Sequence, residues 1–352
     1  MLRISDIKLG TDDTESDLRK KVLKLLGVKN VKSFEISKKS IDARKKPDIH
    51  YVYSVDVETD NEEYYAKKIK NSQIVKKKTY EFPKCGKFDK PVVIVGTGPA
   101  GLMCGLTLAQ NGYKVILLER GKCVEERMKD VEAFWEAGFL NPESNVQFGE
   151  GGAGTFSDGK LNTLVKDTYG RGKEVLSRFV EAGAPSEILY QQKPHLGTDQ
   201  LVGIVQFMRH QIEEMGGEFR FRSTVTDLVV RDQKLAAVIV NEKEEIPAEI
   251  CVLAPGHSAR DTFAMLNKHN LSMEPKSFAV GVRVEHPQTM INQDLYGEPE
   301  NDYLGAASYK VTHTLENGRG VYSFCMCPGG YVVNASSEEG MLAVNGMSYQ
   351  AR

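Results

Sequence analysis

The segment that most constrains the fold is PVVIVGTGPAGLMCGLTLAQNGYKVILLER, residues 91–120. It reads as an unbroken apolar strand, a glycine turn, a helix, and a second apolar strand that begins after Gly112. Strands that are apolar throughout are typical of a sheet covered on both faces, whose strands run parallel. The segment therefore predicts a β–α–β unit within an α/β domain.

Three glycines in this segment have the spacing of a dinucleotide-binding turn. They form a GxGxxG sequence that follows a strand and opens a helix, which is the context that the motif needs. We expect Gly96 to make the tight turn, Gly98 to let the main chain approach a pyrophosphate, and Gly101 to let the helix pack on the strand. Pro99 and Ala100 complete the loop, and the helix N-terminus that they begin offers free N–H groups to phosphates.

An acidic residue ends the second apolar strand. Glu119 lies where a carboxylate bonds the hydroxyl groups of a ribose, and Arg120 follows it. A carboxylate at this position disfavours a nucleotide with a 2′-phosphate. Because the strand, the helix and Glu119 are in register, we expect a bound dinucleotide. The alternative is a glycine-rich turn in an unrelated α/β fold.

A second glycine-rich stretch, QFGEGGAGTFSDGKLNT at residues 147–163, has two interpretations. Glycine and serine give flexible coil, so the stretch can be a mobile linker. Glycine also permits a main chain to pass very close to a ligand, so the stretch can equally be a binding loop.

The length of 352 residues suggests about two domains, and charge is divided unevenly between the two ends of the chain. Residues 1–90 carry 22 Lys+Arg against 15 Asp+Glu, a balance of +7, and the remainder carries 24 against 33, a balance of −9, which together give the net −2. Such a sign change indicates separate modules. Strand patterns at 2–9, 31–37 and 51–59, with a helix capped by Ser16 or Asp17, predict a small α+β module at the start.

Several classes of protein are excluded by composition. Six cysteines are too sparse for a disulfide-stapled secreted fold, and no pair-of-pairs spacing indicates zinc, so we predict no metal. The first residues have no apolar run of signal-peptide length, and the glycines at 96–101 explain the apolar stretch at 92–109 better than a membrane span does. We therefore expect a cytoplasmic protein without membrane partners.

Motifs along nearly the whole chain resemble one family. These are SIDARKK, VGTGPAGL, FGEGGAGTFSDGKL, LAPGHSARDTF, FAVGVRVEHPQ, CMCPGG and NGMS. With the GxGxxG loop near the front of a large domain, the chain resembles FAD-binding proteins of the glutathione reductase type. More narrowly, it resembles the bacterial FAD-dependent dehydrogenases described as NAD(FAD)-utilising.

The resemblance implies further cofactor contacts. A loop after the second strand returns to FAD in such proteins, so residues 150–160 are expected along the pyrophosphate and the flavin edge. The backbone of Val225 is expected at the adenine, and the turn with Ala254 and Gly256 beside the cofactor. The residues expected in the returning loop are Glu150, Gly151, Gly152, Gly154, Thr155 and Lys160. Members of this family are expected to continue past the position of Arg352 with a segment that closes over the flavin.

The expected reaction is that of an FAD-dependent oxidoreductase acting on a small molecule, with NAD(P)H as a transient reductant. No second dinucleotide-binding loop is seen, so we expect the reductant to approach the flavin directly. Disulfide reductases carry two cysteines after the second strand, and only Cys123 lies there, so that mechanism is not favoured. The alternative function is an FAD-binding partner protein whose basic stretch KKSIDARKK contacts RNA, although it lacks interleaved aromatic residues.

No catalytic residue is assigned, and four candidates remain. Cys325 and Cys327 would point to one face of a strand, and two buried small residues are the alternative. His257 and Arg283 can bind an anionic substrate or carry protons, and structural hydrogen bonds are the alternative.

The predicted fold class is α/β, with a Rossmann-like FAD-binding domain, an inserted antiparallel β-rich substrate domain, and a preceding small α+β domain. The expected divisions are a basic module at 1–80, a linker at 81–91, the FAD-binding domain at 92–183 and 198–262, a cap segment at 184–197, a β-rich substrate region at 263–340, and the start of a return segment at 341–352.

Overall fold

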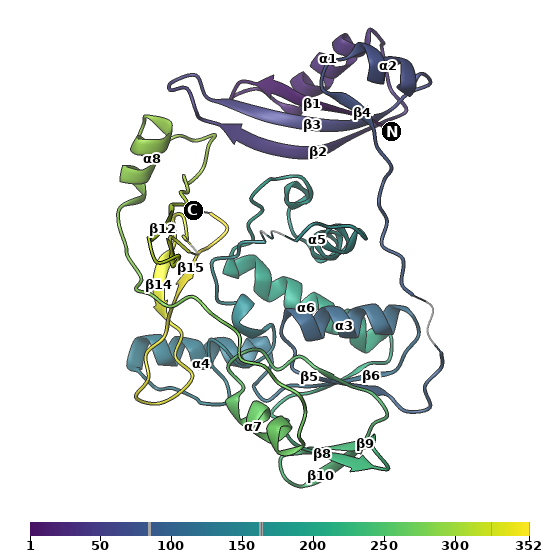
Figure 1. The fold of residues 1–352 in the computed structure, drawn as a ribbon, viewed down its shortest axis with the longest axis vertical. Coiled ribbons are helices and arrows are strands. Elements are labelled where there is room, and N and C mark those ends of the chain that lie inside the picture. The colour runs from purple at the N-terminus through teal and green to yellow at the C-terminus, as the bar shows by residue number, and fades with distance from the viewer. Residues whose placement is uncertain (84–85, 162, 164, 325, 352) are drawn as a thin grey trace.

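The computed structural model describes residues 1–83, 86–161, 163, 165–324 and 326–351. At the N-terminus it has a four-stranded antiparallel sheet in the order β2-β3-β1-β4, with two helices on one face (Figure 1). The elements are β1 Leu2–Leu9, α1 Glu15–Leu26, β2 Ser33–Asp42, β3 His50–Glu58, α2 Glu62–Lys68 and β4 Ser72–Ile74.

The burial pattern of β1 explains how this sheet keeps one apolar face. Leu2 and Ile4 are buried with the period of two that a strand imposes. A bulge with Asp6 at φ 59° then shifts the register, so that Ile7 and Leu9 return to the same core. The helix α1 is capped by Thr14, which forms a reciprocal capping box with Asp17, so the expected cap at Ser16 or Asp17 is wrong by two or three residues.

The centre of the molecule is a parallel sheet in the order β11-β5-β6-β7. Every residue of β5 and β6 is buried, as their unbroken apolar sequences predict, so the α/β prediction is confirmed. The helices α3 and α6 cover one face, while β8, β9, β10 and α7 cover the other (Figure 1). The elements are β5 Val92–Val95, α3 Pro99–Gln110, β6 Val115–Leu118, α6 Thr198–Glu214, β7 Glu218–Arg220, β8 Val225–Arg231, β9 Lys234–Val240, β10 Glu244–Pro247, β11 Cys251–Leu253 and α7 Arg260–Lys268.

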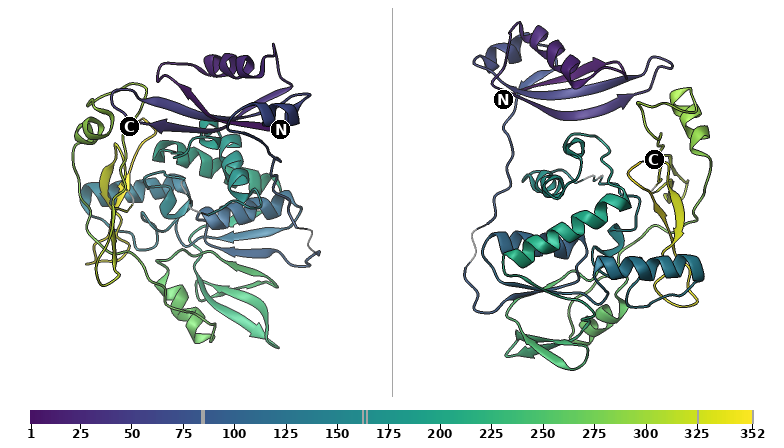
Figure 2. Two further views of the ribbon diagram at one scale, coloured as in Figure 1. Left: turned by 45° about the horizontal axis from the view of Figure 1, so that its top comes forward. Right: turned by 180° about the vertical axis from the view of Figure 1, so that it is seen from behind.

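Between β6 and α6 lie the helix α4 Val124–Ala137, a short 3₁₀ turn η1 Gly152–Gly154, the helix α5 Arg171–Glu181 and a second turn η2 Ser186–Leu189. The second turn leads to the edge of the N-terminal sheet, where Lys39 N–H donates to the carbonyl of Tyr190 and Gln192 N–H donates to the carbonyl of Lys39. These bonds join the N-terminal sheet to the rest of the molecule, and residues 75–83, which follow β4, run along the outside (Figure 2).

The last eighty residues contain less sheet than their alternating sequence predicts. They form the helix α8 Gln288–Tyr296 and two separate two-stranded hairpins, β12 Thr312–Thr314 with β13 Gly320–Tyr322, and β14 Tyr331–Asn334 with β15 Val344–Met347. Within the expected β-rich region at 263–340, the alternating segment SFAVGVRVEH at 277–286 belongs to no strand that the structure describes. Alternation of apolar and polar residues is not sufficient for a strand, because β-structure also depends on packing against neighbouring strands.

Within the described part of the chain, we find no helix that is both long and apolar enough to span a membrane.

Candidate functional site

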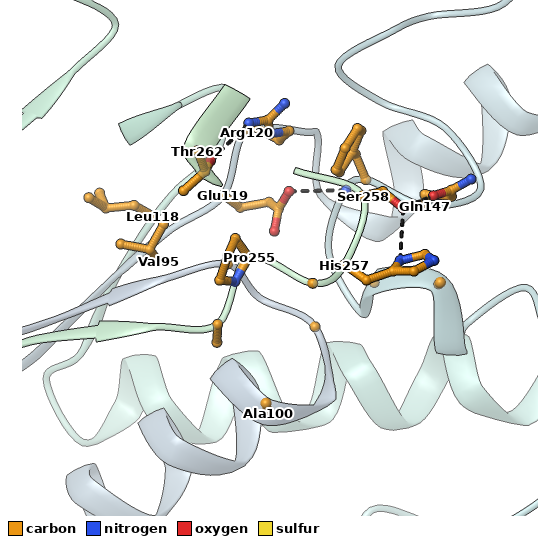
Figure 3. Close-up of a pocket in the computed structure, with 18 of the residues that line it drawn as sticks. Val95, Ala100, Leu118, Glu119, Arg120, Gln147, Pro255, His257, Ser258 and Thr262 are labelled. Atoms are coloured by element: carbon orange, nitrogen blue, oxygen red, sulfur yellow. Dashed lines mark hydrogen bonds between the residues drawn. The ribbon is translucent and has the colours of Figure 1, made fainter. Parts of the chain in front are cut away.

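A cavity of about 310 Å³ opens at the carboxyl edge of the parallel sheet. Open α/β sheets bind their ligands at this edge. Five segments that are far apart in the sequence meet around it, and Figure 3 shows part of this lining. They are the ends of β5 and β6 with the loops that follow, the glycine-rich loop 147–154, residues 223–225 at the start of β8, and the turn 254–258 after β11.

The three glycines of the first loop have different structural roles. Gly96 has φ +95°, and a Cβ there would collide with the carbonyl oxygen of Ala254. A Cβ on Gly101 would collide with the carbonyl oxygen of Gly96, which fits the predicted close packing of helix on strand. A Cβ on Gly98 would meet only the Cα of Gly152, at 3.8 Å. Gly98 alone therefore borders open space, where a ligand can approach the main chain.

The second glycine-rich loop packs directly on the first. Gly152 has φ +60°, and a Cβ there would lie 2.9 Å from the Cα of Gly98. Gly151 N–H donates to the carbonyl of Thr97 at 2.9 Å. Residues 149–154 also spell GxGxxG, a match that the sequence analysis overlooked. Their only regular element is the single turn η1, which neither follows a strand nor opens an α-helix, so this match lacks the context of a dinucleotide-binding unit.

Glu119 lines the cavity, but the chain itself surrounds its carboxylate. Oε1 accepts from the N–H groups of Gly121 and Gly149 at 2.9 and 3.0 Å. Oε2 accepts from the N–H and the hydroxyl of Thr97 at 2.9 and 2.8 Å. A carboxylate can accept about four hydrogen bonds. Glu119 therefore uses its full capacity on these four donors, which come from three different loops.

Arg120 forms one wall of the cavity. Its guanidinium lies 4.5 Å from the ring centre of Phe148, close enough for a cation–π contact, and pairs with Asp261 at 2.8 Å. Thr262, the next residue on α7, also lines the cavity (Figure 3). The Arg120 side chain, which follows β6, therefore contacts both the glycine-rich loop and α7.

Four residues predicted in the returning loop lie outside the cavity lining: Glu150, Gly151, Thr155 and Lys160. Lys160 instead pairs with Asp158 at 2.7 Å, and it forms an isolated bridge with His195. His195 Nε2 in turn lies 2.8 Å from the hydroxyl of Ser348, which is fully buried. The loop therefore contacts the cavity only through residues 147–149 and 152–154.

Glu150 belongs to a buried charge cluster beneath the loop. Its Oε2 accepts from Val124 N–H at 2.8 Å, at the start of α4, and lies 3.2 Å from Nη1 of Arg209. Burial raises the pKa of Glu150 to about 7, against the opposing effects of the Val124 N–H and of Arg209. Arg209 also pairs with Glu125 at 2.5 Å.

Arg127 is a site-supporting residue that the sequence analysis missed. It is fully buried and donates to the carbonyls of Asn145, Val146 and Glu150 at 2.6–2.9 Å. Burial lowers its pKa to about 10. The available signal was its position, because Arg127 occupies the apolar stripe of α4 with Val124 and Val131, where a charged residue needs fixed partners.

The candidate catalytic residues are not gathered in one place. His257 lines the cavity, and its Nδ1 lies 2.9 Å from the hydroxyl of Ser258, which also contacts Gln147 (Figure 3). Cys327 packs against Gly330 and Gly346, and Arg283 approaches Gly346, so both lie outside the cavity lining. Cys325 lies outside the described residues.

The basic stretch at 38–46 is partly engaged within the molecule. Arg44 pairs with Asp42 at 2.7 Å, and Lys46 donates to the carbonyl of Asp294 at the end of α8. No group of three or more His, Cys, Asp and Glu residues able to hold a metal ion occurs where the structure is described.

Three family models match the chain. Residues 277–352 match "FAD-dependent protein, C-terminal domain-like", residues 90–181 match "Pyridine nucleotide-disulphide oxidoreductase", and residues 1–58 match a domain of unknown function. The second match covers β5, α3, β6, α4 and the glycine-rich loop.

Relatives of known sequence are similar over different lengths. An uncharacterised protein of Clostridium beijerinckii is 48% identical over 359 residues, which cover all of this chain and 67% of that protein. The digeranylgeranylglycerophospholipid reductase of Haloferax volcanii is 25% identical over 249 residues, which cover 68% of this chain and 51% of the reductase. The chain thus spans about two thirds and about half of these relatives.

Among solved structures, an L-amino acid deaminase from Proteus vulgaris superposes with a TM-score of 0.34 and 13% identity, over 55% of this chain and 59% of that one. The 48% identical relative, with the family models for FAD-dependent proteins and pyridine nucleotide-disulphide oxidoreductases, identifies the chain as a member of the family of FAD-dependent dehydrogenases.

Proposed function

We propose that this chain is an FAD-dependent oxidoreductase whose cavity at the carboxyl edge of β5 and β6 holds the ADP half of FAD. The observation that carries the proposal is the meeting of two glycine loops at Gly98 and Gly152, where a Cβ on Gly98 would meet only the Cα of Gly152, at 3.8 Å. The space in front of Gly98 is the cradle that a side chain would fill, so the residues present fit a pyrophosphate.

The residues around the cavity suggest the position of each part of the nucleotide. The N-terminus of α3, which begins at Pro99, would direct N–H groups and partial positive charge at the pyrophosphate. Glu119 would hold the ribose. Of its four donors only the Thr97 hydroxyl can rotate away, so a ribose hydroxyl would take that place. Val225 and Thr224 would border the adenine.

Bound FAD supplies the electron and hydride transfer that protein side chains lack. The chain would then bind, orient and shield. Phe148 and Pro255 contribute apolar walls that exclude water, while His257, held by Ser258, presents an exchangeable proton at the cavity rim. With one strand–GxGxxG–helix unit in the sequence, NAD(P)H and the small-molecule substrate would reach the flavin directly.

We also propose the domain division expected from the sequence, with one change. Separate apolar cores around β1–β3 and around β5–β6 support a basic α+β module at 1–80 apart from the dinucleotide domain. The helix α8, however, belongs with the first of these cores rather than with a β-rich substrate region.

The test is FAD binding to the purified chain and to two glycine variants. Gly98→Val adds a side chain where only the Cα of Gly152 is near, so it should leave the fold intact and weaken FAD binding by about 100-fold or more. Gly203→Ala, in open space on α6, is the matched control and should bind as the parent does. Bound flavin in the parent should lose its visible absorbance when NADH or NADPH is added without oxygen.

A parent protein that binds no FAD, or a folded Gly98→Val variant that binds FAD as tightly as the parent, would contradict the proposed site. Circular dichroism of each variant separates loss of binding from loss of fold.

A further inference from the structure

A second cavity, of about 430 Å³, lies between the N-terminal sheet and the chain from α5 to the residues that follow η2. Figure 1 shows this sheet facing α5. The second cavity shares no lining residue with the nucleotide cavity at the edge of the parallel sheet. Small-molecule sites have volumes of roughly 300–1,000 Å³, so the second cavity is large enough for a ligand of its own.

Main-chain hydrogen bonds hold the two sides of the second cavity together. Lys39 N–H on β2 donates to the carbonyl of Tyr190 at 2.7 Å, and Gln192 N–H donates to the carbonyl of Lys39 at 2.9 Å. These bonds pair β2 in parallel with Gln191. The sheet and the residues after η2 are therefore bonded to one another where they line the second cavity.

The sheet side of the second cavity presents positive charge. Arg3 on β1 donates from Nε and Nη2 to the two carboxylate oxygens of Asp56, each at 2.7 Å, and its Nη1 donates to no residue that the structure describes. The ammonium of Lys38 on β2 also pairs with none of the described residues. The described lining contains no acidic residue, so two cations face one adjacent carboxylate and the balance is positive.

Neutral polar side chains surround these two cations. Among the residues that the structure describes, none accepts from or donates to the hydroxyl groups of Ser5 and Ser54 or the side-chain amides of Gln73, Gln191 and Gln192. They come from both sides of the second cavity. A ligand there would meet donors for additional oxygen atoms without breaking a bond within the protein.

Part of the opposite wall is apolar. It is formed by Leu176 on α5 with Ile188 and Leu189 in η2. Small-molecule sites combine an apolar wall with a few polar groups that fix the ligand's orientation. The second cavity has this combination, with its charge on one side and its apolar surface on the other.

The basic stretch at 38–46 favours a small ligand over RNA at this place. The Lys39 ammonium lies 4.1 Å from the ring centre of Tyr51, Arg44 is in an ion pair, and Lys46 donates to a main-chain carbonyl. RNA binding draws its affinity from several cations that neutralise phosphates. Three cations of the stretch are engaged within the molecule, whereas Lys38 faces the second cavity.

We propose that the second cavity binds a small organic anion. Its carboxylate or phosphate lies between Arg3 and Lys38, because guanidinium and ammonium groups form the strongest hydrogen bonds to such groups. Its apolar part lies against Leu176 and Leu189. This site does not depend on the proposed FAD site, since the two cavities have no lining residue in common.

The experiment is isothermal titration calorimetry of the purified chain with phenyl phosphate and with phenylacetate, which carry the two anionic groups on one apolar ring. At least one of them should bind 1:1, about tenfold or more tightly than inorganic phosphate or neutral benzyl alcohol. The tighter of the two identifies the anionic group. Lys38→Glu should weaken this binding by about tenfold or more. Lys29→Glu, the same change at an exposed residue after α1, is the matched control and should bind as the parent does.

The nucleotide cavity can also take an anion, so each titration is repeated with Gly98→Val, and circular dichroism checks the fold of every variant. Binding that is lost in Gly98→Val but kept in Lys38→Glu would assign the probe to the nucleotide cavity and overturn the proposal. No binding of either organic anion, or equally tight binding of inorganic phosphate, would also overturn it. A single-stranded RNA oligonucleotide that binds in their place, and loses affinity in Lys38→Glu, would assign Lys38 to nucleic acid instead.

Discussion

The carboxylate of Glu119 accepts hydrogen bonds from three loops. Thr97 lies 22 residues before Glu119, Gly121 lies 2 residues after it, and Gly149 lies 30 residues after it. The sequence pattern predicts this residue as a ribose ligand, and the contacts add a structural role that the pattern does not contain. A buried acceptor with four donors stabilises the loops whether or not a nucleotide is bound, since each donor would otherwise lose its partner.

Replacing Glu119 with glutamine should therefore destabilise the protein without any ligand. Two of the four donors would face an amide N–H₂ instead of an oxygen, and the free energy of unfolding should fall by about 2–4 kcal/mol. Urea denaturation in the absence of FAD measures the loss. Glu143→Gln, at an exposed carboxylate, is the control and should change stability by less than about 0.5 kcal/mol. An unchanged stability for Glu119→Gln would restrict the carboxylate to ligand binding.

Glu150 should make stability depend on pH. Its pKa is about 7 in the folded protein and about 4.3 in the unfolded chain, so the folded state keeps a proton that the unfolded state has lost between these values. This contribution is fully present below pH 4.3 and is lost as the pH rises through 7, by up to ~4 kcal/mol. The charged groups that face Glu150 are Arg209 on α6, Glu125 and Arg127 on α4, and Glu119 after β6.

The measurement is urea denaturation between pH 5 and 8 for the parent and for Glu150→Gln. The variant cannot lose a proton, so its stability relative to the parent should increase as the pH rises. A constant difference across this range would mean that Glu150 titrates near its ordinary pKa.

At the scale of elements, the helices α3 and α6 each contain a glycine, and we expect the two to respond differently to substitution. A Cβ on Gly101 meets the carbonyl of Gly96, whereas a Cβ on Gly203 of α6 meets nothing within 4 Å. We expect Gly101→Ala to destabilise by about 1–3 kcal/mol through overpacking against backbone. Gly203→Ala should stabilise by about 0.5–1 kcal/mol, because alanine loses less conformational freedom in a helix.

Thermal or urea unfolding of the two variants checks this pair. Similar effects of both substitutions would mean that α3 is not pressed against β5 as closely as the structure has it.

At the scale of the whole molecule, a single core joins the two ends of the chain. Ile291 and Tyr296 of α8, with Leu304 and Ala307, are buried in the apolar core of the N-terminal sheet. Tyr51 on β3 also donates its hydroxyl proton to the carbonyl of Tyr303. The N-terminal sheet therefore depends on residues that are about 240 positions away in sequence.

Ile291→Ala should destabilise this shared core by about 2–5 kcal/mol, because it leaves a cavity that the surroundings fill only in part. Hydrogen exchange should become faster in β1 and β3, while β5 and β6, in a separate core, keep their protection. Met290→Ala, on the exposed side of α8, is the matched control. Unchanged exchange in β3 would show that the N-terminal sheet does not rely on α8.

The β5–α3–β6 unit and the close packing at Gly101 were predictable from the sequence alone, because they follow from periodicity and from a contact between Gly101 and Gly96, five positions apart. The contact of Gly96 with Ala254 joins distant parts of the chain and was not predictable in this way. The N-cap of α1 was not predicted correctly, because Thr14, Ser16 and Asp17 are all residues that favour this position and only the structure shows which of them caps the helix. Residues 225, 254 and 256 were expected at the site from family resemblance, and all three line the cavity.

Tertiary structure decided the rest. It buries Arg127 beneath the glycine-rich loop and surrounds the carboxylate of Glu119 with hydrogen-bond donors from three loops. It also places Glu150 and Lys160 outside the cavity lining. It leaves the alternating segment 277–285 outside the strands that the structure describes, and it joins α8 to the N-terminal core. The physical reason is that a partner for a buried charge, a strand edge or an apolar face lies far away along the chain, where local patterns carry no information about it.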